Sequence, residues 1–410
     1  MKWRHKMKKK MLVKNARVVT PAGIIENGRV LVENGIITGV GGLPGIEAEM
    51  EIDAENSYLI PGFVDLHCDC IEKEIEQRPG SYFPANISII ETDKKAVSSG
   101  ITTTFYSLSF AGVEIGLRSN AKAKEIVSEI IRLKSTLIAD SRIHARFEIT
   151  ATEAVPLLEE LINSGYVDML SLMDHTPGQG QFKTEKDYKN YYGKTYKKDE
   201  SMMEQTIKIK KERKENEAPA NIEKIIKLCA GGNIIMASHD DDSDEKIRFL
   251  AERKIPICEF PVNMSTAKKA REEGLDVILG APNIIKGSSH SNNLSALDAI
   301  KAGYGNIICS DYMAASMIYA VFKIAGAGIL ALHEAVNMTS LNPANAAGLG
   351  KTKGSIEKGK DADMMLVDGS FEVPVIESVF VAGKEAYRRM AAAKSMKAER
   401  PVHENAGYYY

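Results

Sequence analysis

Histidines and carboxylates that could bind a metal ion stand at the ends of apolar runs in the middle of this chain. The run "GFVDLHCDC" carries the first pair, and later runs end in further imidazoles and acids. The full candidate set is His67, Asp69, Glu148, His175, His239 and Asp311. Imidazole and carboxylate together suit zinc first, with iron or manganese as the other choices. The pattern predicts a divalent metal centre, and two ions sharing a carboxylate would supply an activated water at neutral pH.

Two cysteines in the same motif suggest a thiolate zinc site or a redox pair instead. Side chains alternate along a strand, so if His67 and Asp69 face the site, Cys68 and Cys70 face the other way. The remaining cysteines, Cys229, Cys258 and Cys309, are isolated from one another in the sequence. We therefore expect cysteines that pack as small apolar side chains.

Eight strand-length apolar runs, separated mostly by helix-like stretches, must position the metal-binding candidates. The runs are "GFVDLH", "ITTTFYSLS", "RIHARFEI", "VDMLSLMDH", "NIIMASHD", "IPICEFPVN", "DVILGAPN" and "NIICSDY". Repeated βα units predict a TIM-like (β/α)8 barrel over residues 62–349. Active sites of such barrels form at the C-terminal ends of the strands, which is where the candidate residues stand.

The two ends of the chain have a different pattern. Residues 1–61 and 350–390 alternate apolar and polar positions between turns, which is typical of short antiparallel strands. We expect them to form one small β-sandwich domain built from both chain ends, with a tail over residues 391–410.

An insertion at about residues 178–220 interrupts the βα repeat after the fourth run. It is rich in Lys, Tyr and Glu and would lie at the catalytic rim of the barrel. Two interpretations stay open: a solvated helical insertion, or a mobile and positively charged lid over an anionic substrate.

The overall composition is that of a globular protein without a global charge bias. There are 53 basic and 55 acidic side chains, so no net field draws the chain to nucleic acid or to a membrane. No apolar run approaches the roughly 18 residues of a membrane span, and the basic N-terminus lacks the apolar region of a signal peptide. Five cysteines without a regular framework favour a reducing compartment. We expect a cytoplasmic protein.

The sequence resembles the amidohydrolase superfamily of metal-dependent hydrolases. The resemblance rests on "PGFVDLH" with its following acid, on Asp311, and on the tail "NPANAAGLGKTKGSIEKGKDADMMLVD", and it covers nearly the whole chain. It implies a metal-dependent hydrolase on a barrel with a small β-domain, for which a homodimer would be unsurprising.

This chain departs from the superfamily pattern in three places. Many members have His-X-His on the first strand, where this chain has His67-X-Asp69. Many use a carboxylated lysine as the bridging ligand, for which Glu148 is the natural substitute. His175 and His239 fall on the fourth and fifth runs, whereas the superfamily usually uses the fifth and sixth strands.

A string of shorter motifs narrows the resemblance to a phosphonate-utilisation branch of the superfamily. The motifs are "LHCDCIEKEIEQRPG", "SLMDHTPGQGQF", "ASHDDD", "GAPNIIKGSSHSNN" and "CSDY". Members of that branch are diphosphatases, which hydrolyse α-D-ribose 1-methylphosphonate 5-triphosphate to the 5-phosphate and pyrophosphate. The resemblance implies this phosphoric anhydride hydrolysis, with Asp311 orienting the attacking water and accepting its proton.

A small, anionic phosphorylated sugar requires local positive charge and hydrogen-bond donors near the strand ends. The candidates by position are Lys73, Arg78, Arg146, Gln179, Gln181, Lys286, Ser288, Ser289 and His290. Arg146 shares a strand face with Glu148, so it could instead pair with an acid. The others could instead be ordinary exposed loop side chains.

Two other functions remain open at this point. The same barrel and metals could cleave a C–N bond, as in a deacetylase, a cyclic amidase or a deaminase, because fold alone does not decide function. A non-catalytic scaffold on the same fold is the other alternative. The motif string and the cations near the strand ends favour the diphosphatase, and the ligand set spread over five strands argues against the scaffold.

Overall fold

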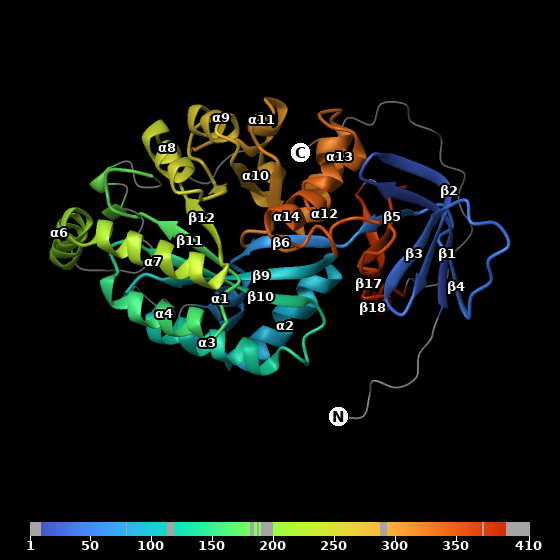
Figure 1. The fold of residues 1–410 in the computed structure, drawn as a ribbon, viewed down its shortest axis with the longest axis horizontal. Helices are drawn as coiled ribbons and strands as arrows, with labels where there is room; N and C mark the ends of the chain where they lie inside the picture. Colours follow the sequence, from blue (N-terminus) through green and yellow to red (C-terminus); the bar gives the residue numbers. More distant parts are fainter. Residues whose placement is uncertain are drawn as a thin grey trace.

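The computed structural model describes residues 10–78, 80–112, 119–180, 184–186, 188–189, 200–287, 293–370 and 373–390. A barrel of eight parallel strands forms its larger part (Figure 1). The strands are β6 (Phe63–Cys68), β9 (Ile101–Phe110), β10 (Asp140–Glu148), β11 (Met169–Met173), β12 (Ile235–His239), β13 (Ile257–Glu259), β14 (Asp276–Gly280) and β15 (Ile307–Cys309). They neighbour one another in chain order, and a parallel bridge between Cys68 and Asp311 brings the last strand back to the first. All eight predicted runs are confirmed as barrel strands.

Helices connect the strands and cover the outside of the barrel. They include α1 (Cys70–Ile75), α2 (Ala85–Ser98), α3 (Asn120–Leu133), α4 (Val155–Asn163), α7 (Ala218–Gly232), α8 (Asp244–Glu252), α9 (Met264–Glu272), α10 (Ala281–Lys286), α11 (Ala296–Lys301), α12 (Ser316–Gly326), α13 (Leu332–Asn337) and α14 (Leu341–Ala346). Outward-facing strand residues such as Tyr106 and Phe147 pack with helix residues such as Ile130 in one large core. Helix α8 begins after Ser243, whose side chain accepts a hydrogen bond from the backbone N–H of Lys246 and so satisfies a donor of the first turn.

The interior of the barrel is apolar in its lower part. Inward-facing strand residues pack there against Ala344 of α14 and the following Ala347. The strand residues are Val64, Leu66, Phe105, Met169, Ala237, Ile257, Ile278 and Ile307. Side chains that point inward nearer the C-terminal strand ends are largely polar, as in His144, Glu148 and Glu259. The polar residues of the barrel interior therefore gather toward the C-terminal ends of its strands.

Both chain ends contribute to the additional strand domain that the sequence predicted. Its strands are β1 (Lys10–Thr20), β2 (Gly23–Glu33), β3 (Ile36–Gly41), β4 (Met50–Asp53), β5 (Tyr58–Pro61), β16 (Met364–Asp368), β17 (Val375–Val381) and β18 (Lys384–Arg388). Antiparallel pairing of β5 with β16 joins the two ends within one hydrogen-bonded sheet. Figure 1 shows this domain, in blue and red, beside the barrel. It has a core of its own, which includes Val13, Val30, Leu59 and Phe380.

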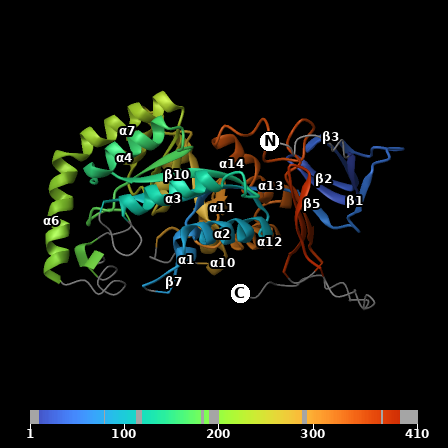
Figure 2. The same cartoon turned by 90° about the horizontal axis from the view of Figure 1, so that it is seen from below.

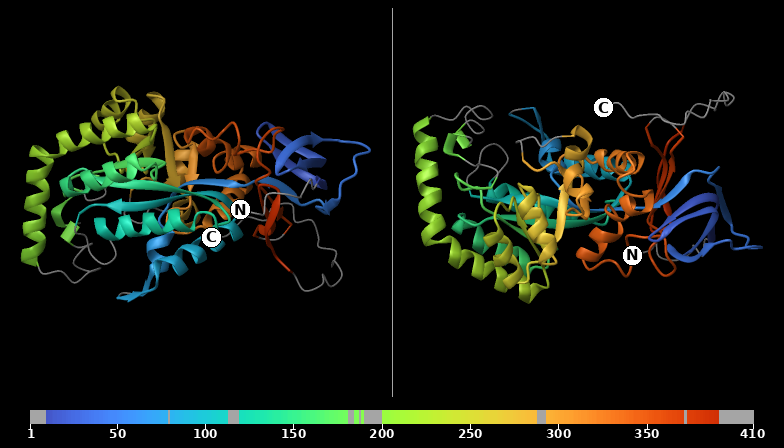
Figure 3. Two further views of the ribbon diagram at one scale, coloured as in Figure 1. Left: turned by 60° about the horizontal axis from the view of Figure 1, so that its bottom comes forward. Right: turned by 90° about the horizontal axis from the view of Figure 1, so that it is seen from above.

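The described part of the insertion after β11 contains helix α6 (Glu200–Asn216). This helix lies at the end of the molecule opposite the terminal strands (Figures 2 and 3). It is followed directly by α7, which leads back into β12. Within the described ranges, no helix is both long and apolar enough to cross a membrane.

Candidate metal centre and active site

Strand β10 carries three polar side chains into the barrel. Alternation points His144, Arg146 and Glu148 inward, because the residues between them pack in the core outside the barrel. The pairing registers of β10 through β13 bring Glu148 level with His239 and Glu259. Regular strand geometry therefore assembles the site from residues far apart in the sequence.

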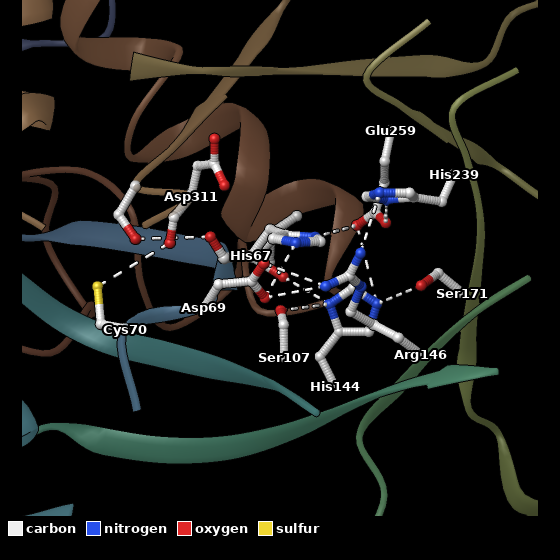
Figure 4. Close-up of polar contacts among 12 residues, drawn as sticks. His67, Asp69, Cys70, Ser107, His144, Arg146, Ser171, His239, Glu259 and Asp311 are labelled. Carbon is white, nitrogen blue, oxygen red and sulfur yellow. Dashed lines mark hydrogen bonds and ion pairs between the residues drawn. The ribbon is translucent and has the colours of Figure 1, made fainter. Parts of the chain in front are cut away.

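Three fully buried residues form a first group of possible metal ligands, which we call the deep group: His67, His144 and Glu259. One ligand atom of each lies within 4.8 Å of those of the other two. The Oε1 atom of Glu259 is 3.3 Å from Nδ1 of His67 and 3.8 Å from Nε2 of His144 (Figure 4).

The His144 ring already has protein partners on both nitrogens. Its Nδ1 atom is 3.0 Å from the carbonyl oxygen of Leu66, which can only accept, so the proton belongs on Nδ1. The Nε2 atom then accepts a hydrogen bond from the Ser171 hydroxyl at 3.0 Å. Burial lowers the pKa of His144 to about 4, so the ring is neutral.

A second set, the shallow group, lies closer to the barrel mouth and consists of His175, His239 and Asp240. Their ligand atoms also lie within 4.8 Å of one another. The Oδ2 atom of Asp240 is 3.8 Å from Nε2 of His175 and 3.6 Å from Nε2 of His239. Two imidazoles and a carboxylate at this spacing fit zinc, iron or manganese. Asp240 has a φ of 55°, a strained conformation for a non-glycine residue and one that recurs at functional sites.

Glu259 links the two groups through its two carboxylate oxygens. Oε1 accepts from Nδ1 of His67, and Oε2 accepts from Nδ1 of His239, each at 3.3 Å. Burial opposes the charge of Glu259, but the surrounding imidazoles outweigh it and hold its pKa well below the ordinary value. Burial likewise lowers the pKa of His67, but Glu259 and Asp69 outweigh it and raise that pKa to about 10. Glu259 therefore fixes the orientation of one histidine from each group.

The predicted ligand Asp69 lies outside both groups and is paired with Arg146. One guanidinium nitrogen is 3.1 Å from each carboxylate oxygen of Asp69, and the other is 3.1 Å from Nε2 of His239. The buried guanidinium therefore bridges two predicted ligands. Arg146 was predicted either to bind substrate or to pair with an acid, and the structure shows the ion pair.

Glu148, another predicted ligand outside both groups, contacts His175 directly. Its Oε2 atom is 3.1 Å from Nδ1 of His175, and Lys210 of α6 is 3.9 Å from the same oxygen. Burial raises the pKa of Glu148, but Lys210 and His175 outweigh it and lower the value to about 2. Nδ1 of His175 therefore faces Glu148, while Nε2 faces Asp240.

Asp311 follows β15 and is fixed to β6 through its backbone. Its N–H donates to the carbonyl of His67 at 2.9 Å, and its carbonyl accepts from the N–H of Asp69 at 2.8 Å. Its φ of 54° is again left-handed. Burial and then the nearby Asp69 raise the pKa of Asp311 to about 6. The carboxylate thus lies beside Asp69 and His67 but outside both groups of ligand atoms.

The described members of the predicted substrate-binding set have different surroundings. The Nζ atom of Lys73 is 4.2 Å from the ring centre of Tyr312, next to Asp311. Gln179 accepts a hydrogen bond from Lys214. Arg78 and Lys286 are exposed, in β7 (Glu76–Arg78) and at the end of α10. Four others, Gln181, Ser288, Ser289 and His290, lie outside the described residues.

Three members of the ligand groups were not predicted as ligands from the sequence. His144 lies two residues before Arg146, so the alternation that paired Arg146 with Glu148 could also have placed His144 inside the barrel. Glu259 lies inside the sixth run and is the last residue of β13, as Glu148 and His239 are the last residues of β10 and β12. Asp240 directly follows His239 at the end of β12 and was not assigned as a ligand.

The cysteines of the opening motif lie away from both ligand groups. Cys68 is buried in the core between the barrel and its helices, as alternation predicted. Cys70 begins α1, and its sulfur lies 3.9 Å from the carbonyl oxygen of Asp311. All five cysteines are free thiols, and neither ligand group contains one.

Comparison with known proteins gives matches along most of the chain. The model of the amidohydrolase family matches residues 58–387. The α-D-ribose 1-methylphosphonate 5-triphosphate diphosphatase of Escherichia coli (strain K12) is 31% identical over 381 residues, which cover 92% of this chain and 100% of the relative. The imidazolonepropionase of Thermoplasma volcanium is 24% identical over 403 residues, covering 86% of this chain and 89% of the relative. Among solved structures, molinate hydrolase has a TM-score of 0.63 at 14% identity and covers 95% of this chain and 100% of that chain.

Proposed function

This chain belongs to the amidohydrolase family, and we propose that it hydrolyses α-D-ribose 1-methylphosphonate 5-triphosphate to α-D-ribose 1-methylphosphonate 5-phosphate and pyrophosphate, in phosphonate catabolism. The observation that carries the proposal is the 31% identity to the E. coli diphosphatase over the whole length of that relative. The site supports it, because two groups of imidazole and carboxylate ligands lie beside several cationic side chains. The proposed substrate is a small anionic sugar, and the proposed location is the cytoplasm.

The shallow group would hold a divalent metal ion through His175, His239 and Asp240. A bound ion would polarise a phosphoryl oxygen and lower the pKa of water. Glu148 and Glu259 would keep the two imidazoles in place, since each accepts a hydrogen bond from an Nδ1 atom. Zinc is the first choice, with iron or manganese next, and two ions per chain remain a prediction.

Asp311 would accept the proton of the attacking water at its carboxylate. Its backbone is hydrogen-bonded to the backbones of His67 and Asp69, which anchors the residue beside the end of β6. Lys73 lies over the ring of Tyr312, the residue after Asp311, and would bind an anionic part of the substrate. Arg146, held between Asp69 and His239, would add positive charge where negative charge develops on the phosphoryl group.

The test is hydrolysis of the triphosphate substrate by the metal-supplemented protein, followed by phosphorus NMR. We expect pyrophosphate together with a 5-monophosphate. Asp311→Asn should lower the rate by about 100-fold or more, the usual contribution of a general base, while retaining the metal content of the wild type. An intact triphosphate after incubation with metal-loaded protein would contradict the proposal.

The second candidate is hydrolysis of a C–N bond. It is supported by the similarity to a relative whose name, imidazolonepropionase, refers to no phosphorylated substrate. Turnover of a cyclic amide by metal-loaded protein, with the triphosphate left intact, would favour this alternative. The lower identity of 24%, against 31% for the diphosphatase, makes it the weaker candidate.

A further inference from the structure

Helix α6 presents one continuous face toward the body of the protein. Positions 203, 207, 210 and 214 follow one another at helical spacing and share that face. Its first half is apolar, because Met203 is 6% and Ile207 is 4% exposed. Its second half carries Lys210 and Lys214, whose side chains are 12% and 36% exposed.

The two lysines reach the rim beside the shallow group. The Nζ atom of Lys210 is 3.9 Å from Oε2 of Glu148, which also contacts His175. The Nζ atom of Lys214 is 3.1 Å from Oδ2 of Asp174, the residue before His175, and donates to Gln179. An inserted helix therefore places two ammonium groups next to the proposed metal site.

Two other lysines of α6, Lys208 and Lys211, are more exposed. Lys208 is 78% exposed and lies 3.9 Å from the exposed Glu212 of the same helix. Lys211 is 49% exposed and pairs with Glu185. Burial of an ammonium group costs free energy, whereas the apolar residues earlier on the inner face dock the helix without that cost. The burial of Lys210 therefore indicates a function beyond docking, and the more exposed Lys214 lies one turn further along the same face.

We propose that Lys210 and Lys214 bind the terminal phosphates of a 5′-polyphosphate chain and give the enzyme its preference for a triphosphate over a monophosphate. This inference rests on the proposed function and deepens it. The part of the triphosphate that leaves as pyrophosphate carries much of the substrate's charge, and local cations must stabilise it. Arg146, between Asp69 and His239, would meet the phosphoryl group under attack. The α6 lysines, which contact Glu148 and Asp174 beside the shallow group, are placed to meet the terminal phosphates. Lysine suits this role as a mobile point charge.

The test compares Lys210→Met and Lys214→Met with the matched control Lys208→Met on the outer face. We expect KM for the triphosphate substrate to rise about 10-fold in each inner variant, with kcat changed much less, because each removes one charged contact. The control should have the KM of the wild type. Lys210→Arg, which keeps the charge, should restore most of the affinity. Equal metal content and thermal unfolding in all variants would show that the effect is not structural.

Binding of inorganic tripolyphosphate, measured by calorimetry on the metal-loaded protein, separates this inference from the proposed function. Pyrophosphate release by the wild type with unchanged KM in both inner variants would overturn the inference and leave the function standing. No pyrophosphate release, with tripolyphosphate binding that is weakened in the inner variants and kept in the control, would overturn the function and support the inference. Failure of the wild type to bind tripolyphosphate would overturn the inference.

Discussion

The deep and shallow groups contain the same kinds of ligand but differ in their surroundings. In the deep group, both nitrogens of His144 are used by Leu66 and Ser171, and all three members are fully buried. In the shallow group, the side chains are 8–14% exposed near the barrel mouth, and the Nε2 atoms of both histidines face Asp240, although that of His239 also contacts Arg146. The difference indicates that a cluster of metal-type residues can serve either as a hydrogen-bonded support or as the ligand site itself.

Glu259 shows how the two groups depend on each other. It orients His67 in the deep group and His239 in the shallow group with a single carboxylate. We infer that the deep group acts as the support that positions the shallow group, and that the first metal ion belongs in the latter. Substitutions in the two groups should therefore have different effects on metal content, and three of them test this division.

The largest effect is expected from His175→Gln in the shallow group. This change removes the imidazole that faces Asp240 on one side and Glu148 on the other. Loss of a residue that only supports a ligand lowers metal affinity or activity about 10- to 100-fold. Loss of a ligand itself should therefore lower kcat/KM by more than about 100-fold. Elemental analysis of the purified protein should show less metal per chain. Wild-type metal content in this variant would show that His175 is not a metal ligand.

An intermediate effect is expected from Glu259→Gln, which acts on both groups. The carboxylate accepts from an Nδ1–H of His67 and of His239, whereas a glutamine amide can accept at one end only and would set an N–H against the other ring. We expect metal affinity to fall about 10- to 100-fold. Stability should fall by about 3–5 kcal/mol, because one partner of a buried charged cluster is removed. Metal titration and urea unfolding measure the two losses, and unchanged metal affinity would contradict the orienting role of Glu259.

The sequence was sufficient to predict the barrel. Strand runs have a local signature, and the rule that barrel sites form at C-terminal strand ends placed His67, His175 and His239 at the rim. Which inward-facing residues touch one another across the barrel is set by strand register, so the meeting of Glu259 with His67 and His144 was not predicted. The position of an inserted helix depends on tertiary contacts. For that reason the lysines of α6 were seen only as part of a charged segment.

The smallest effect on function is expected from His144→Gln in the deep group. If the ring is a support, its loss leaves the buried carbonyl of Leu66 or the hydroxyl of Ser171 without its partner and should cost about 1–3 kcal/mol of stability. The metal content should remain that of the wild type, in contrast to His175→Gln. Urea unfolding and elemental analysis on the same preparation measure both quantities. Loss of one metal ion per chain in His144→Gln would show that the deep group is itself a ligand site, because a neutral imidazole already held by two protein partners would then have to exchange one of them for the metal.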